Sequence, residues 1–255
     1  MKTAIITVAG ISSRFNQGIA PEDHVLKAIF SEGENRQTLL AHLLGHCAFA
    51  DRIIVVGGYR FSDLERYVEA ALSQEVRDRI TLIRNPHFED LASGYSLYLG
   101  LEEALREEPE EVLFVEGDLD IDRASFQAVV EAGTSVLTCS NEPICASKAV
   151  VLYRDSCGRY RYAFNSNHGL LKIDEAFSVI LNSGQLWKFR RMDALRRATW
   201  RFPESDPNGT NLKIIQDYLD QIPQEEVQIL RLRRWTNCNT RQDYRRIRSA
   251  WEEEE

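Results

Sequence analysis

The sequence contains no apolar run that approaches the roughly 18 residues of a membrane-spanning helix, and a single lysine precedes the strand-like start of the chain. It has no C-x-x-C pair, and its five cysteines are odd in number and widely scattered. These absences argue against secretion, a disulfide framework and a structural zinc site. We therefore expect a cytoplasmic protein that neither spans nor binds a membrane.

The chain is acidic overall, with a formal net charge of −8 over 255 residues. An acidic balance argues against nonspecific nucleic-acid binding, so we expect no nucleic-acid partner. Two basic clusters, at residues 188–201 and 231–248, run against the overall charge. They indicate either solvated helix faces or a site for a small phosphorylated ligand, and the sequence leaves both readings open.

Apolar segments rich in β-branched residues alternate with helical patterns in the first half of the chain. The predicted strands are residues 4–9, 52–57, 80–84 and 112–118, and the predicted helices are residues 37–50, 62–73 and 93–106. Continuous apolarity is typical of parallel strands covered on both faces. The alternation predicts an α/β, Rossmann-like, mostly parallel mixed sheet flanked by helices, with ligands at the carboxyl ends of the strands.

The rhythm changes after about residue 140. Residues 147–164 read as a β-hairpin, followed by helices at about 185–199 and 210–221, a strand at 227–235 and a last helix from Thr240. No low-complexity linker interrupts the chain. We expect one domain over residues 1–255, with a nucleotide-binding half at about 1–140 and an acceptor-binding half at about 141–255.

The first predicted strand ends in a turn of small residues, followed by Arg14 and, later, Lys27. Small residues there allow backbone N–H groups to approach phosphate oxygens. The turn is not the dinucleotide fingerprint, because Ser12 and Phe15 stand where that motif needs glycine, and no Walker loop is present. The residues of this turn that we assign to nucleotide binding are Ala9, Gly10, Ser12 and Ser13.

This A-G-x-(small)-x-R segment, with a lysine about a dozen residues later, resembles the signature of the nucleotidyltransferases, such as the sugar-phosphate and molybdopterin-guanylyl enzymes. The stretch from Asn85 to Leu97 is similar to the phosphocholine cytidylyltransferase branch. The resemblance implies a glycosyltransferase-A-like fold, with Arg14 and Lys27 holding the triphosphate. It also implies nucleotide contacts at Gly57, Gly58, Asn85, Ser93, Ser96 and Gly117, although Ser93 also suits a simple helix cap.

The fourth predicted strand ends in Glu116-Gly117-Asp118-Leu119-Asp120. A carboxylate at the end of a buried strand is a natural Mg²⁺ ligand, and the resemblance assigns that role to Asp118. Asp120 either helps to bind the metal or begins a turn before the next helix. The family's second acidic ligand falls on a stretch where this chain has Asn237 and Asn239. The predicted metal ligands are therefore Asp118, Asp120 and Asn239, and the missing acid raises the alternative of a weakened enzyme.

Two further patterns are ambiguous. His42 and His46 have the i, i+4 spacing of a metal clamp, but no third ligand is in register, so we expect a helix-face pair without metal. Aromatic residues cluster in the second half of the chain. They can cage a quaternary ammonium group or simply form core.

Together these features predict a Mg²⁺-dependent nucleotidyltransferase. It would transfer a nucleoside monophosphate, most plausibly CMP from CTP, to a small phosphorylated or phosphonylated acceptor such as phosphocholine, with release of pyrophosphate. The alternatives are a metal-dependent glycosyltransferase that uses Asp118-x-Asp120 and a nucleotide-binding homologue with weakened catalysis. The acceptor and the oligomeric state stay open.

Overall fold

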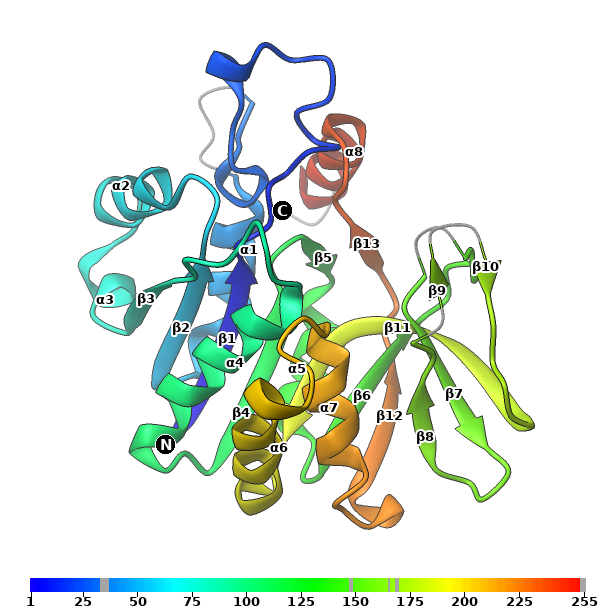
Figure 1. The fold of residues 1–255 in the computed structure, drawn as a ribbon. Coiled ribbons are helices and arrows are strands. Elements are labelled where there is room, and N and C mark those ends of the chain that lie inside the picture. Colours follow the sequence, from blue (N-terminus) through cyan, green and yellow to red (C-terminus); the bar gives the residue numbers. More distant parts are fainter. Residues whose placement is uncertain (33–36, 147–148, 165, 168–169, 253–255) are drawn as a thin grey trace.

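A nine-stranded mixed sheet forms the centre of the protein in a computed structural model, which describes residues 1–32, 37–146, 149–164, 166–167 and 170–252 (Figure 1). Its strand order is β12-β6-β11-β4-β1-β2-β3, and β7 and β8 extend it from β11. The strands of the sheet are β1 (Lys2–Val8), β2 (Arg52–Gly57), β3 (Ile80–Arg84), β4 (Glu111–Glu116), β6 (Ser135–Ser140), β7 (Val151–Asp155), β8 (Tyr160–Tyr162), β11 (Phe177–Phe189) and β12 (Val227–Arg231).

The four strands predicted in the first half of the chain are confirmed. β1 pairs in parallel with β2 on one side and β4 on the other, and β3 pairs in parallel with β2. The apolar side chains of β1, β2 and β4 are buried on both faces of the sheet, and those of the edge strand β3 are partly buried, which explains why the sequence shows runs rather than alternation. The predicted α/β fold with a mostly parallel mixed sheet is also confirmed.

The opposite half of the sheet differs from the sequence prediction. Residues 185–199 were expected to be helical, but residues 185–189 belong to β11, which runs antiparallel to both β4 and β6. Leu186, Trp187 and Phe189 are fully buried there. The helix begins only at Met192. Tertiary pairing on both edges overrides the helical appearance of this segment.

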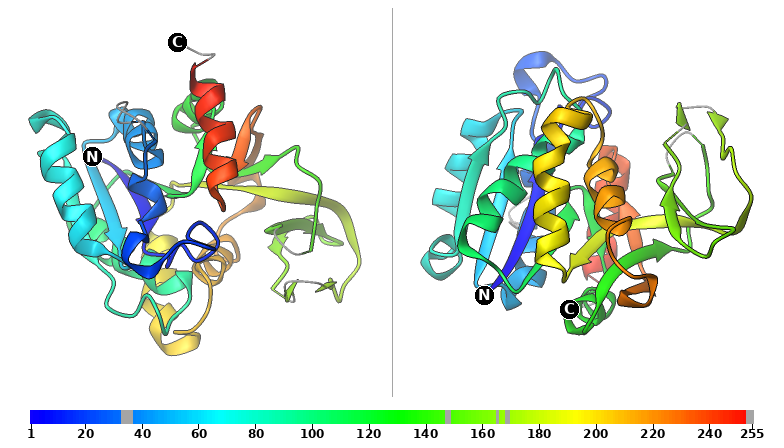
Figure 2. Two further views of the ribbon diagram at one scale, coloured as in Figure 1. Left: turned by 90° about the horizontal axis from the view of Figure 1, so that it is seen from above. Right: turned by 60° about the horizontal axis from the view of Figure 1, so that its bottom comes forward.

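Helices cover both faces of the sheet (Figures 1 and 2). α4, α6 and α7 pack on one face through Leu97, Leu195 and Ile215. α1, α2 and α5 pack on the other. The helices are α1 (Leu39–His46), α2 (Phe61–Ala71), α3 (Gln74–Arg77), α4 (Ser93–Ala104), α5 (Arg123–Glu131), α6 (Met192–Ser205), α7 (Asn211–Leu219) and α8 (Arg241–Glu252).

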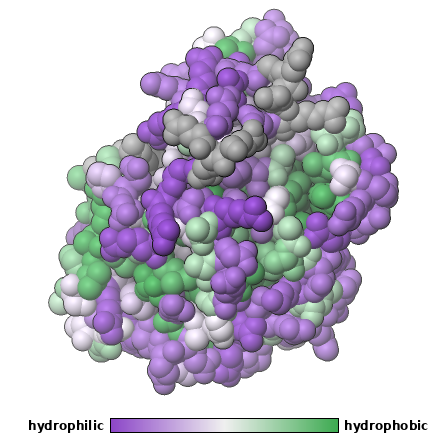
Figure 3. All heavy atoms as spheres, turned by 180° about the vertical axis from the view of Figure 1, so that it is seen from behind, coloured by the Kyte–Doolittle hydropathy of each residue, from purple (hydrophilic) through white to green (hydrophobic). Residues whose placement is uncertain are grey.

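A β-rich arm projects from the body beside the sheet (Figures 1 and 2). It contains the hairpin of β7 and β8, the outer part of β11, and the short strands β9 (Ser166–Asn167) and β10 (Leu170–Leu171). The hairpin confirms the sequence prediction, although its first predicted residues, 147 and 148, lie outside the described residues. Among the described helices none is both long and apolar enough to cross a bilayer, and hydrophilic residues dominate the face in Figure 3.

A small two-stranded sheet brings the end of the chain to the tip of β4. β5 (Leu119–Ile121) pairs antiparallel with β13 (Trp235–Asn237). Next to this pairing, the backbone N–H of Cys238 donates to the carbonyl oxygen of Asp118 at 2.7 Å. Asn237 and Asn239 therefore reach Asp118 across more than a hundred residues of sequence.

Candidate active site

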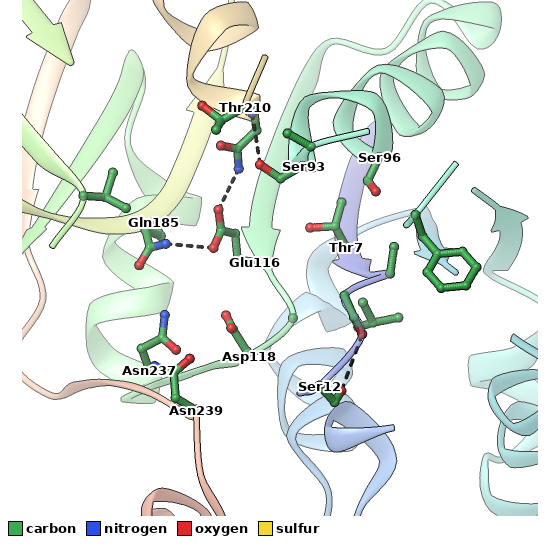
Figure 4. A pocket seen from close by; sticks show the side chains of 18 of the residues that line it. Thr7, Ser12, Ser93, Ser96, Glu116, Asp118, Gln185, Thr210, Asn237 and Asn239 are labelled. Atoms are coloured by element: carbon green, nitrogen blue, oxygen red, sulfur yellow. Dashed lines mark hydrogen bonds between the residues drawn. The ribbon is translucent and has the colours of Figure 1, made fainter. Parts of the chain in front are cut away.

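A cavity of about 590 Å³ opens at the carboxyl ends of β1 and β4 (Figure 4). This is where ligands bind in open α/β sheets. Of the predicted site residues, those that line the cavity are Ala9, Gly10, Ser12, Arg14, Lys27, Asn85, Ser93, Ser96, Gly117, Asp118 and Asn239. Ser13, Gly57, Gly58 and Asp120 lie outside its lining.

The turn after β1 has backbone donors without acceptors, and Gly10, Ser12 and Arg14 of this turn line the cavity. Among the described residues, no oxygen accepts a hydrogen bond from the backbone N–H groups of residues 10–14. Ser12 holds the turn in shape: its φ of 60° is left-handed, and its hydroxyl accepts from the backbone N–H of Lys27 at 3.3 Å. Clustered N–H groups without acceptors form a concave anion site, so this turn is suited to phosphate oxygens.

Lys27 and Asp118 form an ion pair at the floor of the cavity. Lys27 Nζ lies 2.6 Å from Asp118 Oδ2 and also donates to the carbonyl oxygen of Cys238 at 3.1 Å. Both side chains remain about one-fifth exposed. The lysine therefore sits between the turn and the acid, where it can neutralise charge on either.

Two oxygen atoms in the cavity wall have no hydrogen-bond partner among the described residues. They are Asp118 Oδ1 and Asn237 Oδ1, and both are buried. Leaving such oxygens without a partner is costly, and hard oxygen ligands are what Mg²⁺ binds. The described residues contain no group of three or more histidine, cysteine or acidic ligands. The pair therefore fits a cation whose other ligands are phosphate oxygens and water.

Gly117 allows the tips of β1 and β4 to touch. A Cβ atom at this position would lie 2.3 Å from Val8 Cγ1 and 2.7 Å from the carbonyl oxygen of Thr7. The N–H of Gly117 donates to that same oxygen at 2.9 Å. Only glycine permits this approach, which fixes the position of Asp118 relative to the turn after β1.

Glu116 is a cavity residue to which the sequence analysis assigned no role. Its Oε1 accepts from Asn211 Nδ2 at 2.6 Å, and its Oε2 accepts from Gln185 Nε2 at 2.7 Å (Figure 4). Burial and the nearby charge of Asp118 raise the pKa of Glu116 to about 7. The partners come from β11 and the first residue of α7, which no local sequence pattern connects to β4.

One wall of the cavity is built on Asn85 and the start of α4. Asn85 Nδ2 donates to the hydroxyl of Ser96 at 2.9 Å, and Asn85 Oδ1 accepts from the N–H of His87. Ser93 does not cap α4, because Ala92 occupies that position. Its hydroxyl instead accepts from the N–H of Asn211 at 3.2 Å. Ser93 thus joins α4 to α7 across the cavity.

Gly57 and Gly58 lie behind this wall rather than on it. A Cβ at Gly58 would lie 2.5 Å from Phe88 Cβ and 2.9 Å from the carbonyl oxygen of Ala9, and both Phe88 and Ala9 line the cavity. At Gly57 a Cβ would collide with the side chains of Leu64 and Phe61. These glycines allow close packing that shapes the cavity wall.

Asp120 faces away from the cavity and is 1% exposed. Its carboxylate accepts from Arg234 Nε at 3.0 Å and Trp251 Nε1 at 2.7 Å, and His42 Nε2 lies 3.3 Å away. Although burial acts to raise its pKa, these partners hold the pKa below the usual value. With its oxygens engaged in this network, Asp120 is unsuited to the metal role that its spacing from Asp118 suggested.

The basic segment at residues 188–201 also lies outside the cavity lining. Lys188 is buried against Glu111, Arg191 pairs with Glu226, and Arg201 pairs with Asp217. These contacts favour the interpretation that the segment carries structural and surface charge over the interpretation that it binds a phosphorylated ligand.

The aromatic residues of the second half of the chain form no cage in the cavity. Among the described residues, the aromatic side chain in the lining is that of Phe88, from the first half of the chain. Trp187 and Tyr162 are core residues joined by a 2.7 Å hydrogen bond.

His42 and His46 belong to a packed cluster, with His42 stacked on Trp251 and His46 on Phe126. His46 Nε2 lies 2.9 Å from the carbonyl oxygen of Ile121, so it donates its hydrogen there. Burial, followed by the neighbouring His42, lowers the pKa of His46 to about 4, against smaller opposing effects of Ile121 and Asp120. The cluster stabilises the neutral ring.

This depressed pKa predicts acid sensitivity. Because the folded-state pKa lies below the unfolded value, the stabilisation is complete above pH 6.5 and is lost as the pH falls toward 4. Between pH 7.5 and 5, we expect the free energy of unfolding to fall by about 1–2 kcal/mol more in the wild type than in His46→Gln, which keeps a donor but does not titrate. Urea unfolding at both pH values measures this, and equal losses would contradict it.

Sequence comparison identifies the family. Residues 23–251 match the profile described as "Domain of unknown function (DUF6564)". The chain belongs to the DUF6564 family. This match includes Lys27, Asp118 and Asn237, and it stops short of the turn after β1. No curated protein matches the sequence significantly.

Solved structures of nucleotidyltransferases share the fold. The inositol-1-phosphate CTP transferase from T. maritima has a TM-score of 0.67 and 16% identity, with coverage of 95% of this chain and 91% of that one. The CTP:phosphocholine cytidylyltransferase from Streptococcus pneumoniae has a TM-score of 0.65, 14% identity and coverage of 98% and 99%. UDP-glucose pyrophosphorylase has a TM-score of 0.69, 10% identity and coverage of 100% of both chains. These likenesses confirm the predicted fold of the nucleotidyltransferases for this DUF6564 chain.

Proposed function

We propose that the protein is a Mg²⁺-dependent nucleotidyltransferase that transfers CMP from CTP to a small phosphorylated or phosphonylated acceptor and releases pyrophosphate. The observation that carries the proposal is that Gly10, Ser12 and Arg14 of the donor-rich turn line the same cavity as the acid Asp118. A triphosphate needs both features, because its oxygens require N–H donors and its charge requires cations. The names of two fold neighbours support CTP as the nucleotide.

Each residue has a distinct part in the proposed reaction. The N–H groups of residues 10–14 bind the β- and γ-phosphates, and Arg14 and Lys27 neutralise the charge that develops on the leaving pyrophosphate. Asp118 and Asn237 would hold Mg²⁺ through their unpartnered oxygens. When bound, the metal polarises the phosphate oxygens and lowers the barrier to displacement.

In the transfer step, an acceptor phosphate or phosphonate oxygen attacks the α-phosphorus in line. The bond between the α-phosphorus and the β-phosphate bridging oxygen breaks, and pyrophosphate leaves with that electron pair. The acceptor oxygen is already anionic, so no general base is required. The protein's contribution is to align the two phosphates and to neutralise charge.

A pyrophosphate-release screen tests the function. The four NTPs are each combined with phosphocholine, 2-aminoethylphosphonate and several sugar phosphates in the presence of MgCl₂. We expect pyrophosphate with CTP, and a glycosyltransferase would instead release nucleoside diphosphate from a sugar nucleotide. The placement of Asp120 speaks against that alternative, because its engaged carboxylate cannot complete a D-x-D metal site.

A second candidate, a nucleotide-binding protein with little turnover, is favoured by Asn237 and Asn239 in place of acids. It predicts CTP binding in a calorimeter without pyrophosphate from any acceptor.

We also propose a cytoplasmic location. The cysteines form no disulfide among the residues that the structure describes, and Cys47, Cys139 and Cys238 are buried, as suits a reducing compartment.

A further inference from the structure

The cavity contains a carboxylate that the proposed transfer does not use. Glu116 is fixed by two amides from elements remote in sequence, Gln185 on β11 and Asn211 at the start of α7. Gln185 is 5% exposed and Asn211 3% exposed, so both amides are buried and their geometry is set by packing. The inference below rests on the proposed function, since it concerns the acceptor of that same cavity.

The arrangement requires a strained backbone at Gln185. Gln185 adopts a left-handed backbone with φ of 54°, at an irregularity in the pairing of β11 with β6. Non-glycine residues in that conformation are strained, and such strain concentrates at ligand sites. Gln185 and Asn211 each donate one hydrogen bond to one oxygen of Glu116. Each carboxylate oxygen therefore keeps a further lone pair that can accept from a donor in the cavity.

Glu116 forms no ion pair with any residue that the structure describes. The nearby Lys27 acts on its charge but is paired directly with Asp118. Among the described residues, the second half of the chain supplies only uncharged side chains to the cavity lining, including Ala149, Ala163 and Leu212. A cationic ligand would pair with the carboxylate and stabilise its ionised form, whereas a neutral hydroxyl would not.

The surroundings also distinguish between kinds of cation. A quaternary ammonium group donates no hydrogen bond and relies on aromatic faces. Among the described residues, the second half of the chain supplies no aromatic side chain to the cavity lining. A primary ammonium carries three N–H donors and suits a carboxylate with open lone pairs.

We propose that Glu116, positioned by Gln185 and Asn211, is a specificity-determining residue that binds the primary ammonium of an aminoalkyl phosphate or phosphonate acceptor. The phosphate or phosphonate end of such a molecule would point toward the turn after β1 and Asp118. Glu116 thereby selects the acceptor and orients its reacting oxygen.

The test compares 2-aminoethylphosphonate with 2-hydroxyethylphosphonate, which differs from it only at the amine end, and with phosphocholine, a phosphate ester with a quaternary ammonium group. Each acceptor is assayed with CTP and MgCl₂. For the wild type, we expect kcat/KM to be at least about tenfold higher with the amine than with the hydroxyl compound. Glu116→Gln should raise KM for the amine roughly ten- to hundredfold, the range for loss of a charged hydrogen bond. KM for the hydroxyl compound and the Mg²⁺ half-saturation should change less than about threefold.

Glu102→Gln is the matched control, because it removes an exposed carboxylate on α4 outside the cavity lining. It should leave all three acceptors unchanged. Equal preference of the wild type for the three acceptors would overturn the proposal. So would a Glu116→Gln defect that is uniform across acceptors and accompanied by a raised Mg²⁺ half-saturation, since that pattern belongs to a metal ligand.

A calorimetric titration separates this inference from the proposed function. If no acceptor yields pyrophosphate, the proposed function fails, and binding of 2-aminoethylphosphonate to the protein still tests Glu116. Binding that weakens roughly tenfold or more in Glu116→Gln supports the inference. Absent binding to the wild type, or equal binding to the two proteins, overturns it.

Discussion

Replacement of Asp118 by asparagine is expected to lower kcat/KM for pyrophosphate formation by about 10³-fold or more, equivalent to about 4 kcal/mol of transition-state stabilisation. The physical reason is the loss of the negative charge of the Asp118 carboxylate, whose Oδ2 pairs with Lys27 and whose Oδ1 is the proposed cation ligand. Asparagine has nearly the same shape as aspartate, so the cavity wall is retained. The assay is a continuous pyrophosphate measurement over a range of CTP concentrations at saturating acceptor.

The fold of Asp118→Asn should remain intact. Its ion pair with Lys27 is partly exposed, and pairs of that kind contribute about 1 kcal/mol or less. Asp78→Asn, an exposed substitution on the edge of the molecule, serves as the control and should keep full activity. Turnover of Asp118→Asn within tenfold of the wild type would exclude the metal role of this residue.

Asp120→Ala is expected to destabilise the protein by about 3–5 kcal/mol, the cost of leaving a buried charge network without one partner. Arg234, Trp251 and His42 all converge on this carboxylate. Because Trp251 lies on α8, the change should also loosen the last helix from the body. Urea unfolding at pH 7.5 measures the loss, and Asp78→Ala should stay within about 0.5 kcal/mol of the wild type.

The same variant distinguishes a structural acid from a metal ligand. Folded Asp120→Ala, assayed well below its unfolding temperature, should keep the Mg²⁺ half-saturation of the wild type. A large rise in that value with unchanged stability would show that Asp120 binds the cation, contrary to its observed contacts.

Much of the first half of the chain could be predicted from sequence because its signals are local. The strands β1 to β4 are short apolar runs, and the turn at residues 9–14 follows the first of them directly. The carboxyl ends of parallel strands meet at one edge of the sheet. Because β1 and β4 are parallel neighbours, the turn after β1 and Asp118 after β4 lie near each other. Their shared cavity follows from that topology.

The rest of the site depends on contacts that no local pattern encodes. The role of Glu116 emerges only when Gln185 and Asn211, 69 and 95 residues away, are brought to it. β11 mixes polar and apolar residues because one part of it crosses the core and another reaches into the arm, which obscured its period and suggested a helix. The D-x-D spacing of Asp118 and Asp120 suggests that both face the cavity, but only Asp118 does. Asp120 lies in β5, and its side chain is buried in the interior.

The central claim is that a triphosphate and a divalent cation meet between the turn at residues 10–14 and Asp118. A crystal structure with CTP and MnCl₂, with the manganese located by its anomalous signal, tests this most directly. We predict a manganese peak within about 2.0–2.3 Å of Asp118 Oδ1 and phosphate oxygens within hydrogen-bond distance of the backbone N–H groups of residues 10–14. A nucleotide bound elsewhere, or a manganese peak away from Asp118, would contradict the account.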